Sequence, residues 1–157
     1  MRVRKMKENF DKSPVVALLN EILEMELAGV VHYTHYALMV FGYNRIPIVS
    51  WMHSQADESL MHARQAGEMI THLGEHPSLA IGPLLETHKH DIGDILRESL
   101  EHEGAALEKY KELLSLVEGH SVVLEEYARQ MIASEEMHHS EVDKMLRKPG
   151  DVAAYKS

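Results

Sequence analysis

The sequence predicts an all-α protein: a bundle of four long helices, arranged as two antiparallel hairpins joined by a long crossover. Three observations support this fold class. Apolar residues recur every three to four residues over four long segments, and no segment shows the alternation typical of a β-strand. Capping and turn residues separate these segments. The middle connection is long enough to return along the length of a bundle.

Helix-start and helix-stop residues define the first hairpin. The first helix is predicted to begin with Ser13 as its N-cap and Pro14 in its first turn, and to stop at Gly42. The second helix is predicted to begin at Pro47 and to end at Gly74. Because the connection between them is short, the two helices are expected to pack antiparallel.

The second hairpin follows the segment EHPSLAIGPLLETHKH, whose 16 residues contain two prolines and a glycine. A third helix is predicted from Asp91 to Gly119, and Ser121 caps a fourth that ends before Pro149. Helices of roughly 27 residues are about 40 Å long. The connection can therefore run the length of the bundle and leave the second and third helices parallel.

Length and composition restrict the function. The 157 residues are interpreted as a basic N-terminal arm (1–12), one helical bundle (13–148) and a short C-terminal tail (149–157). The absence of cysteine excludes disulfides, thiolate metal sites and cysteine nucleophiles. The net charge of −9 disfavours nucleic-acid binding. Without a secretory signal or an apolar run that could span a membrane, a cytoplasmic protein is expected.

The apolar stripe of each predicted helix is interrupted by acidic or histidine side chains near its middle. The first helix contributes one glutamate, the second a glutamate and a histidine, the third one glutamate, and the fourth a glutamate and a histidine: Glu26, Glu58, His62, Glu103, Glu135 and His138. A single glutamate in such a pattern typically lies at the edge of the stripe and reaches solvent. In a bundle of this connectivity, however, these six side chains are expected to converge at one level.

Four buried carboxylates would repel one another, and the stripes carry no lysine or arginine to offset them. Two divalent cations would supply four positive charges against four negative ones. Carboxylates and neutral imidazoles suit iron, manganese or zinc. The sequence therefore predicts a dinuclear metal site in the bundle core.

The two halves of the chain form a coarse repeat that is out of step by one residue. Glu26 and His62 are 36 residues apart, whereas Glu103 and His138 are 35 apart. We predict that Glu58, and not its neighbour Ser59, is the carboxylate ligand of the second helix, because a serine supplies no charge. Residues three and four before a histidine both face its side of a helix. Either a longer reach by the side chain or a local π-bulge would accommodate the spacing.

The chain resembles a bacterioferritin-type member of the ferritin-like superfamily over about residues 15–147. Four stretches carry this resemblance, one for each helix: LNEILEMELAGVVHYTHY with Glu26 and Tyr33, MHARQAGEMI with His62, LRESLEHEGA with Glu103, and EEMHHSEV with Glu135 and His138. The resemblance implies that Glu58 and Glu135 bridge two iron ions and that Glu26 and Glu103 are terminal ligands. It also implies that all six residues form the catalytic site.

The function implied by this resemblance is a ferroxidase. The family binds two iron ions per subunit, oxidises Fe²⁺ to Fe³⁺ with O₂ or peroxide, and stores or detoxifies the product inside a homo-oligomeric shell. Manganese or zinc could replace iron. Three departures limit the comparison. The family's pattern in the second helix is Glu-x-x-His, and Ser59 stands three residues before His62, where that glutamate is expected. Bacterioferritins hold haem through a methionine just after the bridging glutamate, where this chain has Ser59 or Leu60, so no haem is expected. The family's short fifth helix has little counterpart, which leaves a dimer, a 12-mer and a 24-mer open.

Other interpretations remain at this stage. A di-iron or iron–manganese oxidase or peroxidase without storage would use the same site, and a stress-protective shell protein would use the same assembly. A rubrerythrin-like role is disfavoured because there are no cysteines. Among the remaining histidines, His53 is a candidate secondary cation site. The others are expected on the surface, between helices or in the crossover: His32, His35, His72, His76, His88, His90, His102 and His139.

Overall fold

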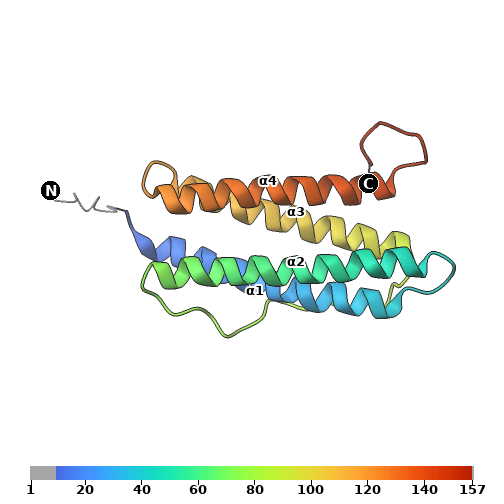
Figure 1. Ribbon diagram of the computed structural model, residues 1–157, viewed down its shortest axis with the longest axis horizontal. Helices are drawn as coiled ribbons and strands as arrows, with labels where there is room; N and C mark the ends of the chain where they lie inside the picture. Colours follow the sequence, from blue (N-terminus) through green and yellow to red (C-terminus); the bar gives the residue numbers. More distant parts are fainter. Residues whose placement is uncertain (1–9, 157) are drawn as a thin grey trace.

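The computed structural model describes residues 10–156, and this part of the chain contains four helices and no strand. The helices are α1 (Lys12–Met39), α2 (Arg45–His72), α3 (Ile92–Val117) and α4 (Val122–Leu146). Figure 1 shows α1 antiparallel to α2, α3 antiparallel to α4, and the crossover returning along the bundle so that α2 and α3 run parallel. The predicted all-α bundle with two hairpins and a long crossover is confirmed.

The helix ends lie close to the predicted positions, with one change at the start of α1. The N-cap is Asp11, whose carboxylate accepts a hydrogen bond from the Ser13 backbone N–H at 3.0 Å, so Ser13 itself lies in the first turn. Gly42, Gly74 and Gly119 follow the ends of α1, α2 and α3 with positive φ angles, as expected of C-terminal glycines. The predicted basic arm lies mostly outside the described residues.

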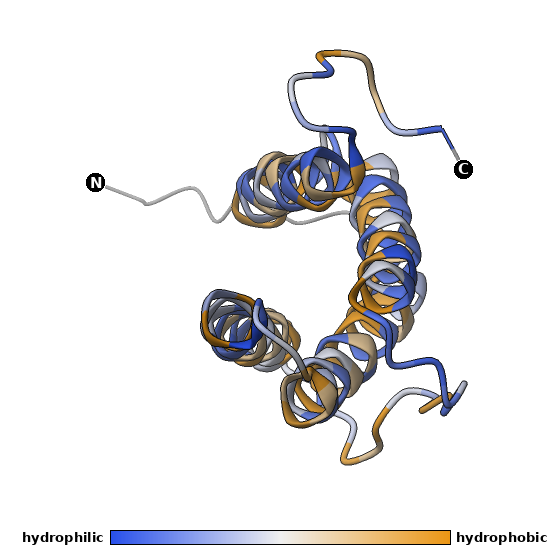
Figure 2. Cartoon of the chain, turned by 90° about the vertical axis from the view of Figure 1, so that its right-hand side faces the viewer, coloured by the Kyte–Doolittle hydropathy of each residue, from blue (hydrophilic) through white to orange (hydrophobic). Residues whose placement is uncertain are grey.

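Three pairs of helices pack closely: α1 with α2, α3 with α4, and α1 with α3. Viewed along the bundle in Figure 2, the remaining side, between α2 and α4, is the widest. This side matters for the site, because side chains from α2 and α4 meet across it.

The core is divided into two apolar clusters. One cluster contains Leu19, Ile70, Leu113 and Leu124. The other lies towards the opposite ends of the same helices: Tyr33, Met52, Ile95 and Val142. The residues between the clusters along all four helices include the buried polar side chains Glu26, Ser59, His62, Ser99, Glu103 and Glu135. A polar layer thus separates two apolar ones, which is the arrangement that the interrupted stripes predict.

The buried face of α2 differs from the prediction by one residue over its first half. Helical spacing counted back from His62 predicts a core face through Trp51, Gln55 and Glu58, but the buried side chains are Met52, Ala56 and Ser59, which continue to His62. The prediction was wrong because the polar segment of α2 has too few large apolar residues to fix its rotation. Glu58 therefore lies at the edge of the core, and Ser59 lies inside it.

The crossover is fastened along α1 by hydrogen bonds. The backbone N–H of Ser78 donates to Asn20 Oδ1 at 2.7 Å, and that of Gly82 donates to the Glu24 carbonyl at 2.9 Å. A Cβ at position 82 would lie only 3.0 Å from that carbonyl oxygen, so glycine permits the close approach. Within residues 10–156, no helix is both long and apolar enough to cross a membrane.

Candidate metal centre

All six predicted residues reach the polar layer, and five of them form two overlapping groups. The first group is Glu26, His62 and Glu135, and the second is Glu103, Glu135 and His138. Within each group, one ligand atom from every residue lies within 4.8 Å of the others. Glu135 belongs to both groups, so two cations bound there would share its carboxylate.

The first group is buried and closely packed. His62 Nδ1 lies 3.2 Å from Glu135 Oε1 and 3.5 Å from Glu26 Oε1. All three side chains are almost inaccessible to solvent. The other oxygen of Glu135, Oε2, is buried and has no hydrogen-bond partner within the described residues. A buried carboxylate oxygen without a donor is costly, and a cation would satisfy it.

Glu58 lies outside both groups but contacts the two imidazoles from the solvent side. Its Oε1 is 2.9 Å from His138 Nε2 and 3.8 Å from His62 Nε2. Its side chain is 27% exposed, compared with 2% for Glu135. Residues 58–62 are regular α-helix, so the alternative of a π-bulge is wrong and the glutamate spans the extra residue by its own reach.

Ser59 occupies the buried position three residues before His62, where it contacts α1. A Cβ built on Gly29 would lie 3.0 Å from Ser59 Oγ and 3.1 Å from His102 Nε2. The small residues at 29 and 59 therefore let α1 and α2 approach closely beside the site. A glutamate at position 59 would have to displace this packing, which explains in physical terms why the carboxylate comes from position 58.

Two tyrosines hold the glutamates of the opposite half. Tyr110 of α3 donates its hydroxyl hydrogen to Glu26 Oε1 of α1 at 2.8 Å. Tyr33 of α1 donates to Glu103 Oε1 of α3. The family resemblance includes Tyr33 beside Glu26, whereas Tyr110 stands at an ordinary position of the apolar stripe of the third helix. The signal was present, since each tyrosine follows the glutamate of its own helix by seven residues.

Without a metal ion, protons offset part of the negative charge of the buried carboxylates. Burial opposes a charge on His62, but the carboxylates of Glu135 and Glu26 outweigh it and raise the pKa of His62 to about 10. Burial, reinforced by Glu135, raises the pKa of Glu103 to about 8. Burial is also the main reason that the pKa values of both Tyr33 and Tyr110 are raised well above the usual value, so both hydroxyls remain donors. Protons thus occupy positions that cations could take.

The six predicted residues line one pocket, and the side chains around it suit divalent cations. No lysine or arginine lines it, and the lining residues that sequence reasoning missed are Gln55, Ser59, His102 and Ala106. His102 is partly buried, and burial lowers its pKa, so its imidazole is neutral near pH 7. Four carboxylates with two imidazoles, no competing cationic side chain and an unpartnered carboxylate oxygen fit two ions of the iron, manganese or zinc class.

Comparisons with known proteins identify the family and the fold. A family model described as a ferritin-like domain matches residues 16–150. A comparison with curated proteins found no match.

Three solved structures are similar to the chain. One is a dodecameric thioferritin, a bacterioferritin-related protein of Bacteroides fragilis, with a TM-score of 0.80 and 22% identity over 87% of this chain and 86% of that one. A ferritin-like diiron-carboxylate protein from Bacillus anthracis has a TM-score of 0.75 and 24% identity over 85% and 96%. Rhodobacter capsulatus bacterioferritin, with a metal-free dinuclear site and a haem iron, has a TM-score of 0.78 and 21% identity over 87% and 86%. At these identities the likeness establishes the fold.

Proposed function

The chain belongs to the ferritin-like domain family, and from this premise we propose that it is a bacterioferritin-like ferroxidase. It binds two Fe²⁺ ions per subunit and oxidises them to Fe³⁺ with O₂ or peroxide, for iron storage or detoxification. One observation carries the proposal: two metal-binding groups share Glu135, whose second oxygen is buried without a partner in the described chain. Glu26, Glu58, His62, Glu103, Glu135 and His138 are the proposed ligands and catalytic residues.

Each proposed ligand has a role that follows from its position. Glu135 would bridge the two ions, because it belongs to both groups. Glu26 and Glu103 are terminal ligands, each oriented by a tyrosine hydroxyl. Glu58 and His138 form the solvent-facing side, where the Glu58 carboxylate, which contacts His138, would be available to an incoming ion. Iron supplies the redox chemistry, and the protein sets its charge balance and geometry.

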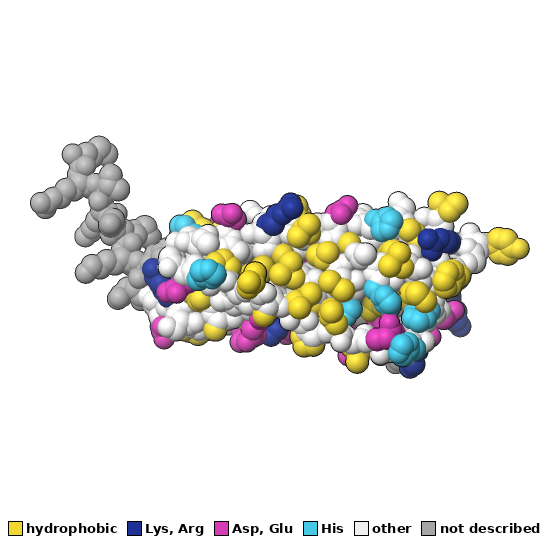
Figure 3. Space-filling model, turned by 90° about the horizontal axis from the view of Figure 1, so that it is seen from below, with side chains coloured by type: hydrophobic (Ala, Val, Ile, Leu, Met, Phe, Trp, Pro, Cys, Tyr) yellow, Lys and Arg dark blue, Asp and Glu magenta, His cyan; other side chains and the backbone are white. Residues whose placement is uncertain are grey.

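The same proposal includes self-association into a closed shell without haem. Large apolar side chains are exposed where α1 turns into α2: Leu38, Phe41, Tyr43 and Ile46. Figure 3 shows further hydrophobic side chains gathered along one face. Such surfaces typically become buried between subunits. From its place in the first hairpin, Met52 is also predicted at a subunit contact, but its side chain is fully buried in the core of its own subunit.

The test combines three measurements on protein purified without chelators. We expect two metal ions per chain by elemental analysis, Fe²⁺ oxidation faster than in buffer, and a native mass of a closed oligomer by light scattering. The Glu103→Ala/Glu135→Ala double variant should remain helical and lose rapid oxidation. Tight dinuclear binding in that variant would refute the site. A monomeric native mass with full oxidation would instead favour an oxidase or peroxidase without storage.

A further inference from the structure

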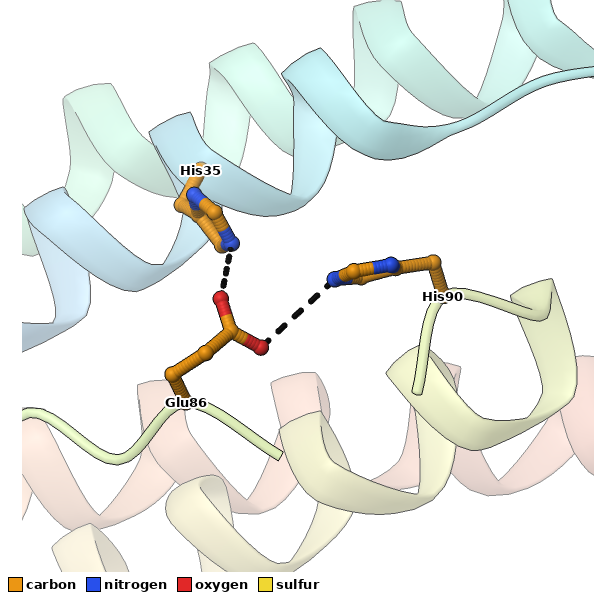
Figure 4. A group of neighbouring side chains, drawn as sticks. All are labelled: His35, Glu86 and His90. Carbon is orange, nitrogen blue, oxygen red and sulfur yellow. Dashed lines mark ion pairs between the residues drawn. The ribbon is translucent and has the colours of Figure 1, made fainter. Parts of the chain in front are cut away.

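A third group of metal-binding side chains lies between α1 and the crossover, in contacts separate from those of the dinuclear centre. His35 comes from α1, Glu86 from the crossover, and His90 from the end of the crossover just before α3 (Figure 4). One ligand atom of each lies within 4.8 Å of the other two. No pattern in the sequence connects these residues, because Glu86 lies 51 positions after His35.

The two imidazoles each point one ring nitrogen at the same carboxylate. His35 Nε2 lies 2.7 Å from Glu86 Oε2, and His90 Nε2 lies 3.5 Å from Glu86 Oε1. Both nitrogens are shielded from solvent, and neither has a hydrogen bond of acceptable geometry within the described residues. The side chains as a whole remain open to solvent, with His35 42%, Glu86 39% and His90 27% exposed, so an ion from solution can reach all three. Elsewhere along α1, ordinary hydrogen bonds hold the crossover.

The spacing and charge of the three donors suit a small divalent cation. Zinc binds histidine nitrogens at about 2.0–2.1 Å and carboxylate oxygens at similar distances, so neighbouring tetrahedral ligands lie about 3.3 Å apart. The observed 2.7 and 3.5 Å fall on either side of that value. A hydrogen bond from the His88 backbone N–H lowers the pKa of Glu86, which keeps its carboxylate ionised.

The backbone between the two crossover residues holds them in place. His88 adopts a positive φ of 55°, which is uncommon for a residue other than glycine. The turn is anchored where the Thr87 hydroxyl donates to Glu98 of α3. His88 is largely exposed, with Nδ1 3.9 Å from Glu86 Oε1, so rotation of its side chain would offer a fourth ligand. Figure 3 shows histidine and acidic side chains gathered at this end of the molecule.

We propose that His35, Glu86 and His90 bind a single divalent cation of the zinc class and thereby fasten the crossover to α1. Two histidines and one carboxylate are an established ligand set for zinc, with the fourth position left to water or another side chain. The site is independent of the ferroxidase proposal, because it shares no residue with the dinuclear centre. Its role is structural: the cation joins a helix to a connection that otherwise has no regular secondary structure.

The experiment measures Zn²⁺ binding in a background that lacks the dinuclear centre. The full-length Glu103→Ala/Glu135→Ala protein, checked for helicity, is titrated with Zn²⁺ by calorimetry and with Co²⁺ by visible absorption. We expect a stoichiometric Zn²⁺ site in this background and its loss on adding His35→Ala/His90→Ala. Glu86→Gln, which preserves shape but removes the charge, should weaken binding roughly tenfold or more. His72→Ala/His76→Ala, two exposed histidines at the end of α2 and the start of the crossover, is the matched control and should bind normally.

A second measurement tests the fastening itself. Trypsin can cleave after Lys89, which is exposed within the crossover. Zn²⁺ should slow this cleavage in the background protein and in the His72→Ala/His76→Ala control, but not in His35→Ala/His90→Ala. Zinc binding that is unchanged by His35→Ala/His90→Ala overturns the proposal, as does a background protein that binds no zinc at all. In that outcome the three residues form only an ion-paired contact.

Discussion

The two halves of the bundle build their parts of the candidate metal centre in the same way, with one exception. Glu26 and Tyr33 lie seven residues apart on α1, and Glu103 and Tyr110 lie seven apart on α3. Each tyrosine bonds to the glutamate of the other helix. The arrangement therefore has an approximate two-fold symmetry, in which each half orients the terminal carboxylate of the other.

The exception is the carboxylate that accompanies each histidine. In the second half, Glu135 is buried and belongs to both metal-binding groups. In the first half, Ser59 takes the equivalent buried position, and Glu58 reaches the site from its exposed edge. In the proposed metal centre, Glu135 would therefore be the deeply fixed shared carboxylate, and Glu58 would lie where an incoming ion meets it first.

The largest expected effect comes from breaking the buried side. Glu135→Gln keeps the size of the side chain but removes the charge shared by both groups. We expect both metals to be lost. Fe²⁺ oxidation should fall by more than the roughly 10- to 100-fold that is typical when a residue hydrogen-bonded to a metal ligand is removed. Glu26→Gln removes a member of one group only and should leave about one metal per chain. Equal stoichiometry in the two variants would show that Glu135 is not shared.

A smaller effect is expected from the exposed side. Glu58→Ala removes the carboxylate that contacts His62 and His138, so we expect slower oxidation and a loss of one metal or of tight binding at one position. Ser59→Ala is the control, because it keeps the small volume against Gly29 and should stay near wild type. The measurements are metal stoichiometry and initial oxidation rate. If Ser59→Ala impaired oxidation and Glu58→Ala did not, Ser59 and not Glu58 would be the ligand that α2 supplies.

Sequence patterns were sufficient for the fold and for the polar layer, because these depend on long-range periodicity. The interrupted stripes placed Glu26, His62, Glu103, Glu135 and His138 at one level, and the structure brings them together. The same reasoning failed for the rotation of α2, where Met52 and Ser59 are buried instead of Trp51 and Glu58. A shift of one residue turns a helix by about 100°, which a weakly apolar segment cannot fix.

Contacts between segments far apart in the chain were not predictable. The position of Tyr110 on an apolar stripe predicts only core packing. Its hydrogen bond to Glu26 depends on how α1 and α3 pack, which the sequence pattern does not show. His90 belonged to a crossover without periodicity, and the backbone turn at His88 brings it to His35. Irregular segments give no pattern from which such a meeting could be inferred.

The symmetric tyrosines should give a moderate and equal effect. Tyr33→Phe and Tyr110→Phe each remove one hydroxyl that orients a terminal glutamate, while the rings stay packed. We expect each to weaken metal binding by roughly 10- to 100-fold, as is typical for outer partners of a ligand. The measurement is Fe²⁺ or Co²⁺ affinity, with thermal stability as the control for packing. A strong effect of one variant and none of the other would contradict the two-fold arrangement.

The least invasive test changes no residue and counts protons. Each half of the metal-free site holds one extra proton at pH 7, because the pKa of His62 is raised to about 10 and that of Glu103 to about 8. Metal ligands bind deprotonated, so filling the site near pH 7 should release about two protons per chain. Near pH 9 Glu103 is already ionised, and only the proton of His62 remains to be released. Calorimetry in buffers of different ionisation enthalpy measures both numbers.

The same two groups make the stability of the metal-free protein depend on pH. Because folding raises both pKa values, protonation stabilises the metal-free fold. This stabilisation is complete below the unfolded-state pKa values and is lost as the pH rises through about 8 for Glu103 and then about 10 for His62. The metal-free protein should therefore melt at lower temperature as the pH rises from 7 to 9, and bound metal should remove that decline. If no protons were released at pH 7, His62 and Glu103 would not be protonated in the metal-free site.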